Sequence, residues 1–307
     1  MSAGAERPAA PASRRDLALP AGAATLVFVR HGESTYVAEG RFQGRLDPPL
    51  SALGERQAAL VAERLARRNE GTPLPIPAGP PIGVWHSPLR RAADTARALA
   101  RAQPAVVPLH LSDELTEIAQ GAWEGVPAAE VRARWPAELA AWRQSPTTDH
   151  APGGEPVLQA AARVRGGLLG IVSALAAAVT DRQPAPMAAP SGPATPESAD
   201  AAAAAASLRF EPVPGYPSLA AADGAPLDPW AVVVAHDGIF RLALMTLLDV
   251  PYERFWSFPF NLAAVTVVAL NDGVATLRAH NLSEHLAPLA EQERAAAEAR
   301  GDRRGAL

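Results

Sequence analysis

Two short apolar runs in the sequence each lead, directly or after one arginine, into a histidine that is followed within two residues by a glycine. "TLVFV" leads into Arg30, His31 and Gly32, and "AVVVA" leads into His236. Arginine and histidine fill a hydrophobic core poorly, but both bind anions, and a neutral imidazole can also act as a nucleophile. The pattern therefore predicts an anion site beyond the carboxyl ends of two buried strands.

A third apolar run, "IGVW", leads into "HSPLRRAADTA" and brings another cation to the same edge. On a helix, Arg91 lies outside the solvated face of its charged neighbours and can reach over the strand ends. That solvated face carries Arg90, Asp94, Arg97 and Arg101. Two arginines and two histidines are therefore expected to converge, which suits the oxygens of a phosphoryl group.

The elements that must position these side chains alternate along the chain. Strands are expected at 25–29, 82–87, 105–109 and 230–236, and the pair 263–270 and 274–280 flanks an Asn-Asp-Gly hairpin turn. Helices are expected at 51–68, about 88–101, 126–144 with an interruption at Pro136, 157–179 and 239–248. This order predicts an α/β protein whose mostly parallel sheet is covered on both faces and has an antiparallel edge.

Composition limits the classes of partner and chemistry. The 307 residues suffice for one large domain or two small ones, and the net charge of −4 argues against nucleic acid or an anionic membrane as a partner. No cysteine is present, which excludes disulfides and thiolate catalysis. The apolar stretches are interrupted before membrane-spanning length, and residues 1–24 lack the apolar core of a secretory signal. We expect a cytoplasmic protein with a disordered N-terminal extension.

Residues 181–229 interrupt the alternating pattern, because proline, alanine, serine and glycine dominate and no periodicity is visible. Their composition favours a largely disordered surface insertion. The alternative is a lid over the active site, with "RFEPVPGYP" (209–217) as its ordered part. Residues 288–307 form a charged, alanine-rich tail that is interpreted as a frayed terminal helix.

Seven motifs occur in an order that resembles a known family: "RHGES", "RFQGRLDPPLSALG", "SPLRRAADTA", "TEIAQGAWEG", "PGGEP", "AHDG" and "NLSEHL". Together they resemble the histidine phosphatase superfamily, also called the phosphoglycerate mutase-like family, over roughly 25–180 and 230–287. The resemblance implies one catalytic domain at 25–287, with the insertion inside it. It also implies a three-layer α/β/α sandwich that uses neither a metal nor another cofactor.

The resemblance assigns roles to the candidate catalytic residues. His31 would be the nucleophile that becomes phosphohistidine, and Arg30, Arg91 and His236 would hold the phosphoryl oxygens. Glu117, in "LTEIAQGAWEG", would protonate the leaving oxygen and later activate water. For these roles His31 must be neutral, with its second ring nitrogen held by a backbone carbonyl, and Glu117 must be desolvated enough to be protonated.

Four further residues are candidate substrate contacts. Gln43 and Gly44 are expected to line the pocket, and Ser34 either donates to the phosphoryl group or caps the following helix. Asp237 is interpreted mainly as a helix N-cap, with a substrate contact as the alternative, because a carboxylate facing phosphate would weaken binding. Val37 stands where the family commonly has an asparagine that donates to phosphate, so Gln43 or backbone groups would have to compensate.

Three function classes follow from the resemblance. "RFQG" and "HDGIF" favour a phosphomonoester hydrolase that acts on a small phosphate ester. The alternative is a phosphoglycerate mutase, which commonly shows H-G-N-S after the second histidine and a basic pair in the helical region that covers the site. Arg132 and Arg134 are the candidates for such a pair, but their spacing of two places them on different helix faces, so both are expected to be solvated. A non-catalytic phosphate binder would be expected to have lost His31, His236 or Glu117. His280 and His285 lack a suitable acidic partner for a metal site.

Overall fold

The strands form one six-stranded sheet in the order β3-β2-β4-β1-β5-β6. The computed structural model describes residues 17, 19–181, 228–289 and 291–292. Within these ranges the strands are β1 (Ala24–Arg30), β2 (Val84–His86), β3 (Leu109–Leu111), β4 (Trp230–Ala235), β5 (Val265–Asn271) and β6 (Val274–Leu282). β1 pairs in parallel with β4, and the β5–β6 hairpin adds an antiparallel edge beside β1, which confirms the expected sheet.

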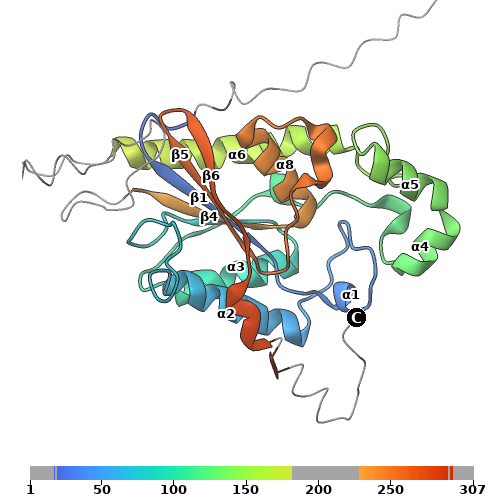
Figure 1. The fold of residues 1–307 in the computed structure, drawn as a ribbon, viewed down its shortest axis with the longest axis horizontal. Coiled ribbons are helices and arrows are strands. Elements are labelled where there is room, and N and C mark those ends of the chain that lie inside the picture. Colours follow the sequence, from blue (N-terminus) through green and yellow to red (C-terminus); the bar gives the residue numbers. More distant parts are fainter. Residues whose placement is uncertain (1–16, 18, 182–227, 290, 293–307) are drawn as a thin grey trace, which may run out of the picture.

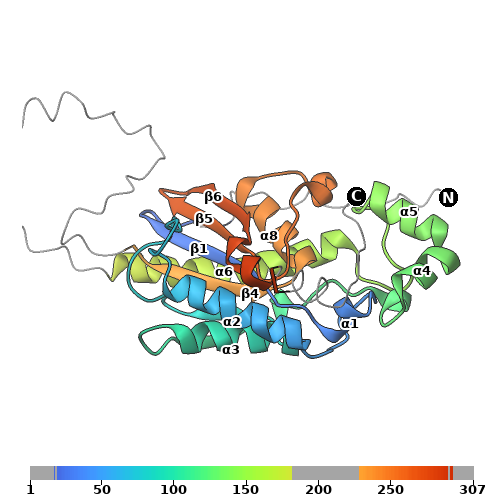
Figure 2. The ribbon, with the colours of Figure 1, turned by 60° about the horizontal axis from the view of Figure 1, so that its bottom comes forward.

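Helices cover both faces of this sheet (Figures 1 and 2). On one face lie α2 (Ala52–Ala66) and α3 (Arg90–Ala102), and on the other lie α6 (Val157–Thr180) and α8 (Asp237–Leu248). β1 contributes side chains to the hydrophobic core on both faces of the sheet, because successive side chains of a strand point to opposite faces. Val27 and Val29 pack toward α2 and α3, whereas Leu26 and Phe28 pack toward α6 and α8. The expected three-layer α/β/α sandwich is confirmed.

A smaller helical region extends from one end of the sheet (green in Figure 1). Its helices are α4 (Ala128–Arg134) and α5 (Pro136–Gln144). The remaining short helices and helical turns of the described chain are α1 (Thr35–Ala38), η2 (Asp113–Leu115), η3 (Gly121–Trp123), η4 (Tyr252–Ser257) and η5 (Glu284–Leu286). Pro136 begins α5, where a missing N–H interrupts no hydrogen bond. This region has its own small core around Trp123, Val131 and Leu139.

Helix α6 is long and apolar. By length and composition it is the single described helix that would be able to cross a membrane, with a mean hydropathy of 1.5. Its buried residues, which include Val164, Leu168 and Ile171, instead form one stripe that packs against α8, β1 and β4. α6 is therefore a core helix of the sandwich, as its periodicity predicts.

Several element boundaries differ from those expected, and the third strand differs most. The third strand is Leu109–Leu111 rather than 105–109, because Pro108 has no N–H to donate to a ladder and Val106 before it is fully solvent-exposed. Among the described residues before β1, Leu17 is buried in the core. The expectations for 1–16, for the insertion and lid at 182–227, and for 293–307 lie outside the described residues.

Candidate active site

The parallel pairing of β1 with β4 brings the two strand-end histidines together. Each ring lies just past the last residue of its strand, and the His31 and His236 ring centroids are 5.0 Å apart. Arg91, in the first turn of α3, is fully buried beside them, and its Nε donates to His31 Nε2 at 3.3 Å. Arg30 completes the group, which we call the catalytic cluster (Arg30, His31, Arg91 and His236). The sequence predicted all four members of this set, and the structure places them together.

His31 is held as a neutral imidazole with one nitrogen available. Its Nδ1 lies 2.6 Å from the carbonyl oxygen of Gly32 and donates to it, so Nε2 keeps its lone pair. Burial, with the nearby charges of Arg91 and Arg30, holds the pKa of His31 well below its usual value. A side chain at position 32 would collide with the carbonyl of Gly54, so glycine is required for this close approach of loop and helix. His31 is thus arranged to attack an electrophile through Nε2.

Arg91 is fixed by the backbone of the loop that follows α1. Its Nη1 donates to Leu46 O at 2.8 Å and its Nη2 donates to Gly44 O at 3.0 Å. Gly44 has a φ of +50°, which a glycine adopts without strain. Burial lowers the pKa of Arg91 to about 10, so the guanidinium is still charged at neutral pH. Gly44 therefore contributes to the site through its carbonyl, which orients the Arg91 guanidinium.

His236 and Arg30 each have one buried ring or guanidinium nitrogen that forms no hydrogen bond within the described chain. Ser87 Oγ lies 2.8 Å from His236 Nε2, while the buried Nδ1 of His236 has no partner there. Arg30 Nη1 donates to Phe260 O at 2.5 Å, and its buried Nε is likewise unpartnered among these residues. Burial first, and then the charge of Arg91, lowers the pKa of His236 well below its usual value. Sequence reasoning missed Ser87, although it stands in "HSPLRR" directly after a strand.

Glu117 lies against the first turn of α8. Its Oε1 accepts from its neighbour's backbone, Ile118 N, at 2.9 Å, and its Oε2 accepts from Gly238 N at 3.4 Å. A Cβ at Gly238 would lie only 2.7 Å from Oε1, so a larger residue would displace this carboxyl. Burial raises the pKa of Glu117, and the charge of Asp237 raises it further, while Ile118 N–H and the arginines oppose the shift. This shift is in the direction that a general acid requires.

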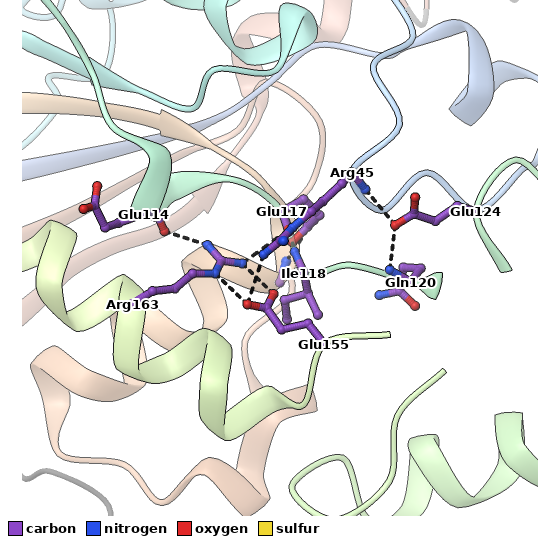
Figure 3. A network of polar contacts seen from close by, with 9 residues as sticks. Arg45, Glu114, Glu117, Ile118, Gln120, Glu124, Glu155 and Arg163 are labelled. Atoms are coloured by element: carbon purple, nitrogen blue, oxygen red, sulfur yellow. Dashed lines mark hydrogen bonds and ion pairs between the residues drawn. The ribbon is translucent and has the colours of Figure 1, made fainter. Parts of the chain in front are cut away.

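A second group of charges holds the backbone of Glu117 in place (Figure 3). Arg163 donates to both carboxylate oxygens of Glu155 at 2.8 Å, and Arg45 Nη2 donates to Glu155 Oε1 at 3.1 Å. Both guanidinium groups also donate to the carbonyl oxygen of Glu117 at 3.3 Å. We call Arg45, Glu155 and Arg163 the supporting network. The sequence analysis missed its roles, although Glu155 stands in "PGGEP" and Arg45 in "RFQGRLDPPLSALG".

The comparisons with known proteins identify the family. The model of the histidine phosphatase superfamily (branch 1) matches residues 26–180 and 219–283. The chain belongs to this superfamily.

Among the curated relatives, phosphoserine phosphatase 1 of Hydrogenobacter thermophilus is 35% identical over 141 residues, which are 46% of this chain and 61% of that protein. Glucosyl-3-phosphoglycerate phosphatase of Mycobacterium tuberculosis is 38% identical over 141 residues, 46% of this chain and 56% of that protein. A solved structure of mycobacterial glucosyl-3-phosphoglycerate phosphatase complexed with VO3 has a TM-score of 0.57 and 27% identity, and the match covers 84% of this chain and 99% of that one. The alignments thus span less than two thirds of these two curated relatives, both of which are named as phosphatases.

In this histidine phosphatase fold, the predicted binding residues have mainly structural contacts. Ser34 caps α1 by accepting from Val37 N at 3.2 Å, and its hydroxyl donates to Gln43 Oε1 at 2.5 Å. Asp237 is not the N-cap of α8, since His236 occupies that position. Asp237 is instead the first residue of the helix, and its Oδ2 pairs with Arg241 Nε at 3.1 Å. Whether these residues contact substrate is a separate prediction.

Glu124 has structural contacts, and the two arginines that were expected to be solvated are so. Glu124 Oε1 accepts backbone hydrogen bonds from Arg45 and Gln120, at 2.9 and 2.8 Å. Arg132 and Arg134 are exposed. The described ranges hold no cluster of three or more histidine, aspartate and glutamate side chains that could bind a metal ion.

Proposed function

We propose that this protein is a metal-independent phosphomonoester hydrolase that works through a phosphohistidine on His31. The observation that carries this proposal is the state of that ring. Its Nδ1 donates to Gly32 O at 2.6 Å, its Nε2 faces Arg91 Nε at 3.3 Å, and the low pKa keeps it unprotonated. The names of the relatives and the complex of a structural relative with VO3 support phosphoryl chemistry at such a site.

The reaction divides into two displacements at phosphorus. In the first, His31 Nε2 forms a P–N bond while the ester P–O bond breaks, and Glu117 gives its proton to the leaving oxygen. In the second, Glu117 takes a proton from water, the water oxygen bonds to phosphorus and the P–N bond breaks. His31 is then neutral again and inorganic phosphate is released.

The remaining cationic and polar groups stabilise the transferring phosphoryl group. The guanidinium groups of Arg30 and Arg91 match its oxygens geometrically and neutralise its charge. With Ser87 donating to Nε2 of His236, the Nδ1 of that ring carries a proton that it can donate to a phosphoryl oxygen. Arg30 and Arg91 form no ion pair within the described residues, which favours binding of a dianion over a neutral ligand.

The substrate we propose is a small phosphate ester. We propose that the protein acts on it in the cytoplasm and needs no cofactor, nucleic acid or membrane as a partner. The net charge of −4 supports a local rather than a general anion site. The alternative, a phosphoglycerate mutase, needs a basic pair to hold the carboxylate of a retained sugar acid. The candidates for that pair, Arg132 and Arg134, are exposed, and Arg134 is paired with Glu130. An assay of 3-phosphoglycerate with its bisphosphate primer distinguishes the two, and efficient interconversion would favour the mutase.

The central test is hydrolysis of p-nitrophenyl phosphate in the presence of EDTA. His31→Ala is expected to lower kcat by at least about a thousandfold, because the nucleophile is lost. A matched control is His110→Ala, which removes a ring stacked on Trp85 outside the catalytic cluster and is expected to retain turnover. An acid-labile, alkali-stable phosphoryl group should accumulate on wild type after rapid quenching. Full turnover by His31→Ala would disprove the proposed nucleophile.

A further inference from the structure

Asp237 has a buried carboxylate oxygen whose hydrogen-bonding capacity no described residue uses. Its Oδ2 accepts from Arg241 Nε at 3.1 Å, whereas Oδ1 is buried and accepts no hydrogen bond within the described part of the chain. A buried acceptor without a donor costs free energy, and buried polar groups are nearly always paired. Oδ1 therefore requires a donor from a bound molecule or water.

Arg241 cannot rotate to serve this second oxygen. Its Nη1 donates to Phe255 O at 3.2 Å, and its guanidinium lies over the rings of Phe255 and Trp256, at 5.7 and 5.2 Å from their centroids. The arginine is buried, with 8% of its surface exposed. It therefore fixes the orientation of the Asp237 carboxylate and leaves Oδ1 as the oxygen that is free to accept.

Asp237 lies beside the general acid. It stands between His236 and Gly238, and the N–H of Gly238 donates to Glu117 Oε2 at 3.4 Å. The charge of Asp237 raises the pKa of both Glu117 and Arg30, which places the carboxylate near the acid and near a phosphoryl-binding cation. In the proposed reaction the leaving oxygen receives its proton from Glu117. Asp237 is therefore in a position to contact the atoms bonded to that oxygen.

We propose that Asp237 accepts a hydrogen bond from a hydroxyl or ammonium group on the leaving group, and thereby selects phosphomonoesters that carry such a donor near the ester oxygen. This proposal rests on the phosphatase function proposed above. A purely apolar leaving group would bury Oδ1 without a donor, and a leaving group with a carboxylate at the same position would be repelled. Asp237 is thus a specificity-determining residue rather than a helix cap.

Three substrates of equal length test the proposal: 2-hydroxyethyl phosphate, 2-aminoethyl phosphate and propyl phosphate. Their leaving groups end in a hydroxyl, an ammonium and a methyl group, and they are otherwise matched. Wild type is expected to show a kcat/KM about tenfold or more higher for the first two than for propyl phosphate, since a hydrogen bond to a charged group contributes about 1.5–3 kcal/mol. Ratios within one enzyme preparation do not depend on the fraction of folded protein.

Two variants identify Asp237 as the source of that preference. Asp237→Ala is expected to lower both ratios to about one, because the acceptor is gone. Asp237→Asn keeps an acceptor oxygen but loses the charge, so the ammonium preference should fall further than the hydroxyl preference. Glu63→Gln is the matched control, because Glu63 pairs with Arg67 at the same four-residue spacing on the exposed surface of α2 and should leave both ratios unchanged.

The outcomes separate the two proposals. Hydrolysis of all three esters with equal kcat/KM, or a wild-type ratio that persists in Asp237→Ala, would overturn the role of Asp237 and leave the phosphatase function standing. Failure of wild type to hydrolyse any of them, together with p-nitrophenyl phosphate, would overturn the phosphatase function itself. A preference for the ammonium ester alone would narrow the substrate class to amino alcohol phosphates.

Discussion

The catalytic cluster and the supporting network place their arginines in opposite electrostatic situations. In the supporting network, Arg163 and Arg45 share the carboxylate of Glu155. Burial by itself raises the pKa of Glu155, but the hydrogen bonds and charges of the two arginines outweigh this and lower it. In the catalytic cluster, Arg91 is fully buried and no carboxylate forms an ion pair with it within the described residues. Burial lowers its pKa to about 10.

This difference indicates that the supporting network stabilises the structure, whereas the catalytic cluster is suited to bind an anion. A paired buried charge satisfies itself, so it stabilises the conformation of the Glu117 loop and has little need of a ligand. An unpaired buried cation is destabilising until an anion binds, and the free energy it gains then can be directed to a phosphoryl dianion. The predictions below test this contrast, because altering the cluster should change activity most, and altering the network should change stability most.

The largest expected effect after loss of the nucleophile is that of Arg91→Ala. We expect kcat/KM for p-nitrophenyl phosphate to fall by about a thousandfold, because one preorganised charged donor to the transition state is worth about a hundred- to a thousandfold and Arg91 offers a planar fork. Steady-state kinetics measure this.

The control for Arg91→Ala is Arg97→Ala on the same helix, whose arginine is exposed and paired with Asp94. It should have wild-type kinetics. If Arg91→Lys restored full activity, the fork geometry would be irrelevant, and a simple positive charge would suffice.

Glu117→Gln is expected to lower kcat by about a hundredfold for alkyl phosphates, because the leaving alkoxide then has no proton donor. The pH dependence follows from the pKa directions. His31 is neutral above its lowered pKa, so activity is lost as the pH falls through that value. Glu117 is protonated below its raised pKa, so activity is lost as the pH rises through that value.

The pH profile of kcat/KM for wild type should therefore be bell-shaped, and the alkaline limb should disappear in Glu117→Gln. A profile that keeps this limb in the variant would assign the acid to another residue. Glu114→Gln, an exposed carboxylate three residues earlier in the chain, is the control and should retain the wild-type profile.

How far the sequence predicts this site depends on where the side chains lie. The catalytic cluster could be predicted because its members stand at the end of an apolar strand or, for Arg91, in the first turn of the helix that follows one, and parallel strands end at the same edge of a sheet. The supporting network could not, since Arg163 on α6 looks like any solvated helix residue until the fold brings Glu155 and the Glu117 carbonyl beside it. Asp237 was interpreted as an N-cap because the boundary of α8 could not be placed to within one residue.

Glu155→Gln tests the structural role of the supporting network. The amide keeps the shape of the side chain but leaves Arg163 without its carboxylate, so the free energy of unfolding is expected to fall by about 2 kcal/mol. The expected change in kcat is smaller, about several-fold, since the backbone of Glu117 loosens while the catalytic cluster remains. Urea denaturation and steady-state kinetics measure the two effects.

The matched control for Glu155→Gln is Glu130→Gln, which breaks an exposed ion pair with Arg134 of 2.7 Å on α4. Its cost should be below about 1 kcal/mol. Equal destabilisation by the two variants would contradict the structural role of the network. A thousandfold loss of kcat in Glu155→Gln with unchanged stability would instead place Glu155 in the chemistry.

The smallest expected effect concerns Val37, which stands where the family commonly has an asparagine. Val37 is half-buried on α1 and, with Arg30 and Leu262, lines an open hollow of about 650 Å³ next to the catalytic cluster. A valine contributes no donor there, whereas an asparagine would present an amide N–H. Val37→Asn is therefore expected to tighten competitive inhibition by inorganic phosphate about three- to tenfold, the value of one neutral hydrogen bond of about 1 kcal/mol.

The same substitution should leave stability nearly unchanged, since the α1 cap depends on the backbone N–H of residue 37 and not on its side chain. Val37→Thr is the matched variant, because it keeps the branched shape and adds a hydroxyl too short to reach as far as an amide. Tighter inhibition in Val37→Asn alone would mean that this site retains the geometry for the missing donor. Unchanged inhibition in both variants would show that Gln43 or backbone groups already satisfy the phosphoryl oxygens on this side, and that position 37 faces the hollow rather than the bound phosphate.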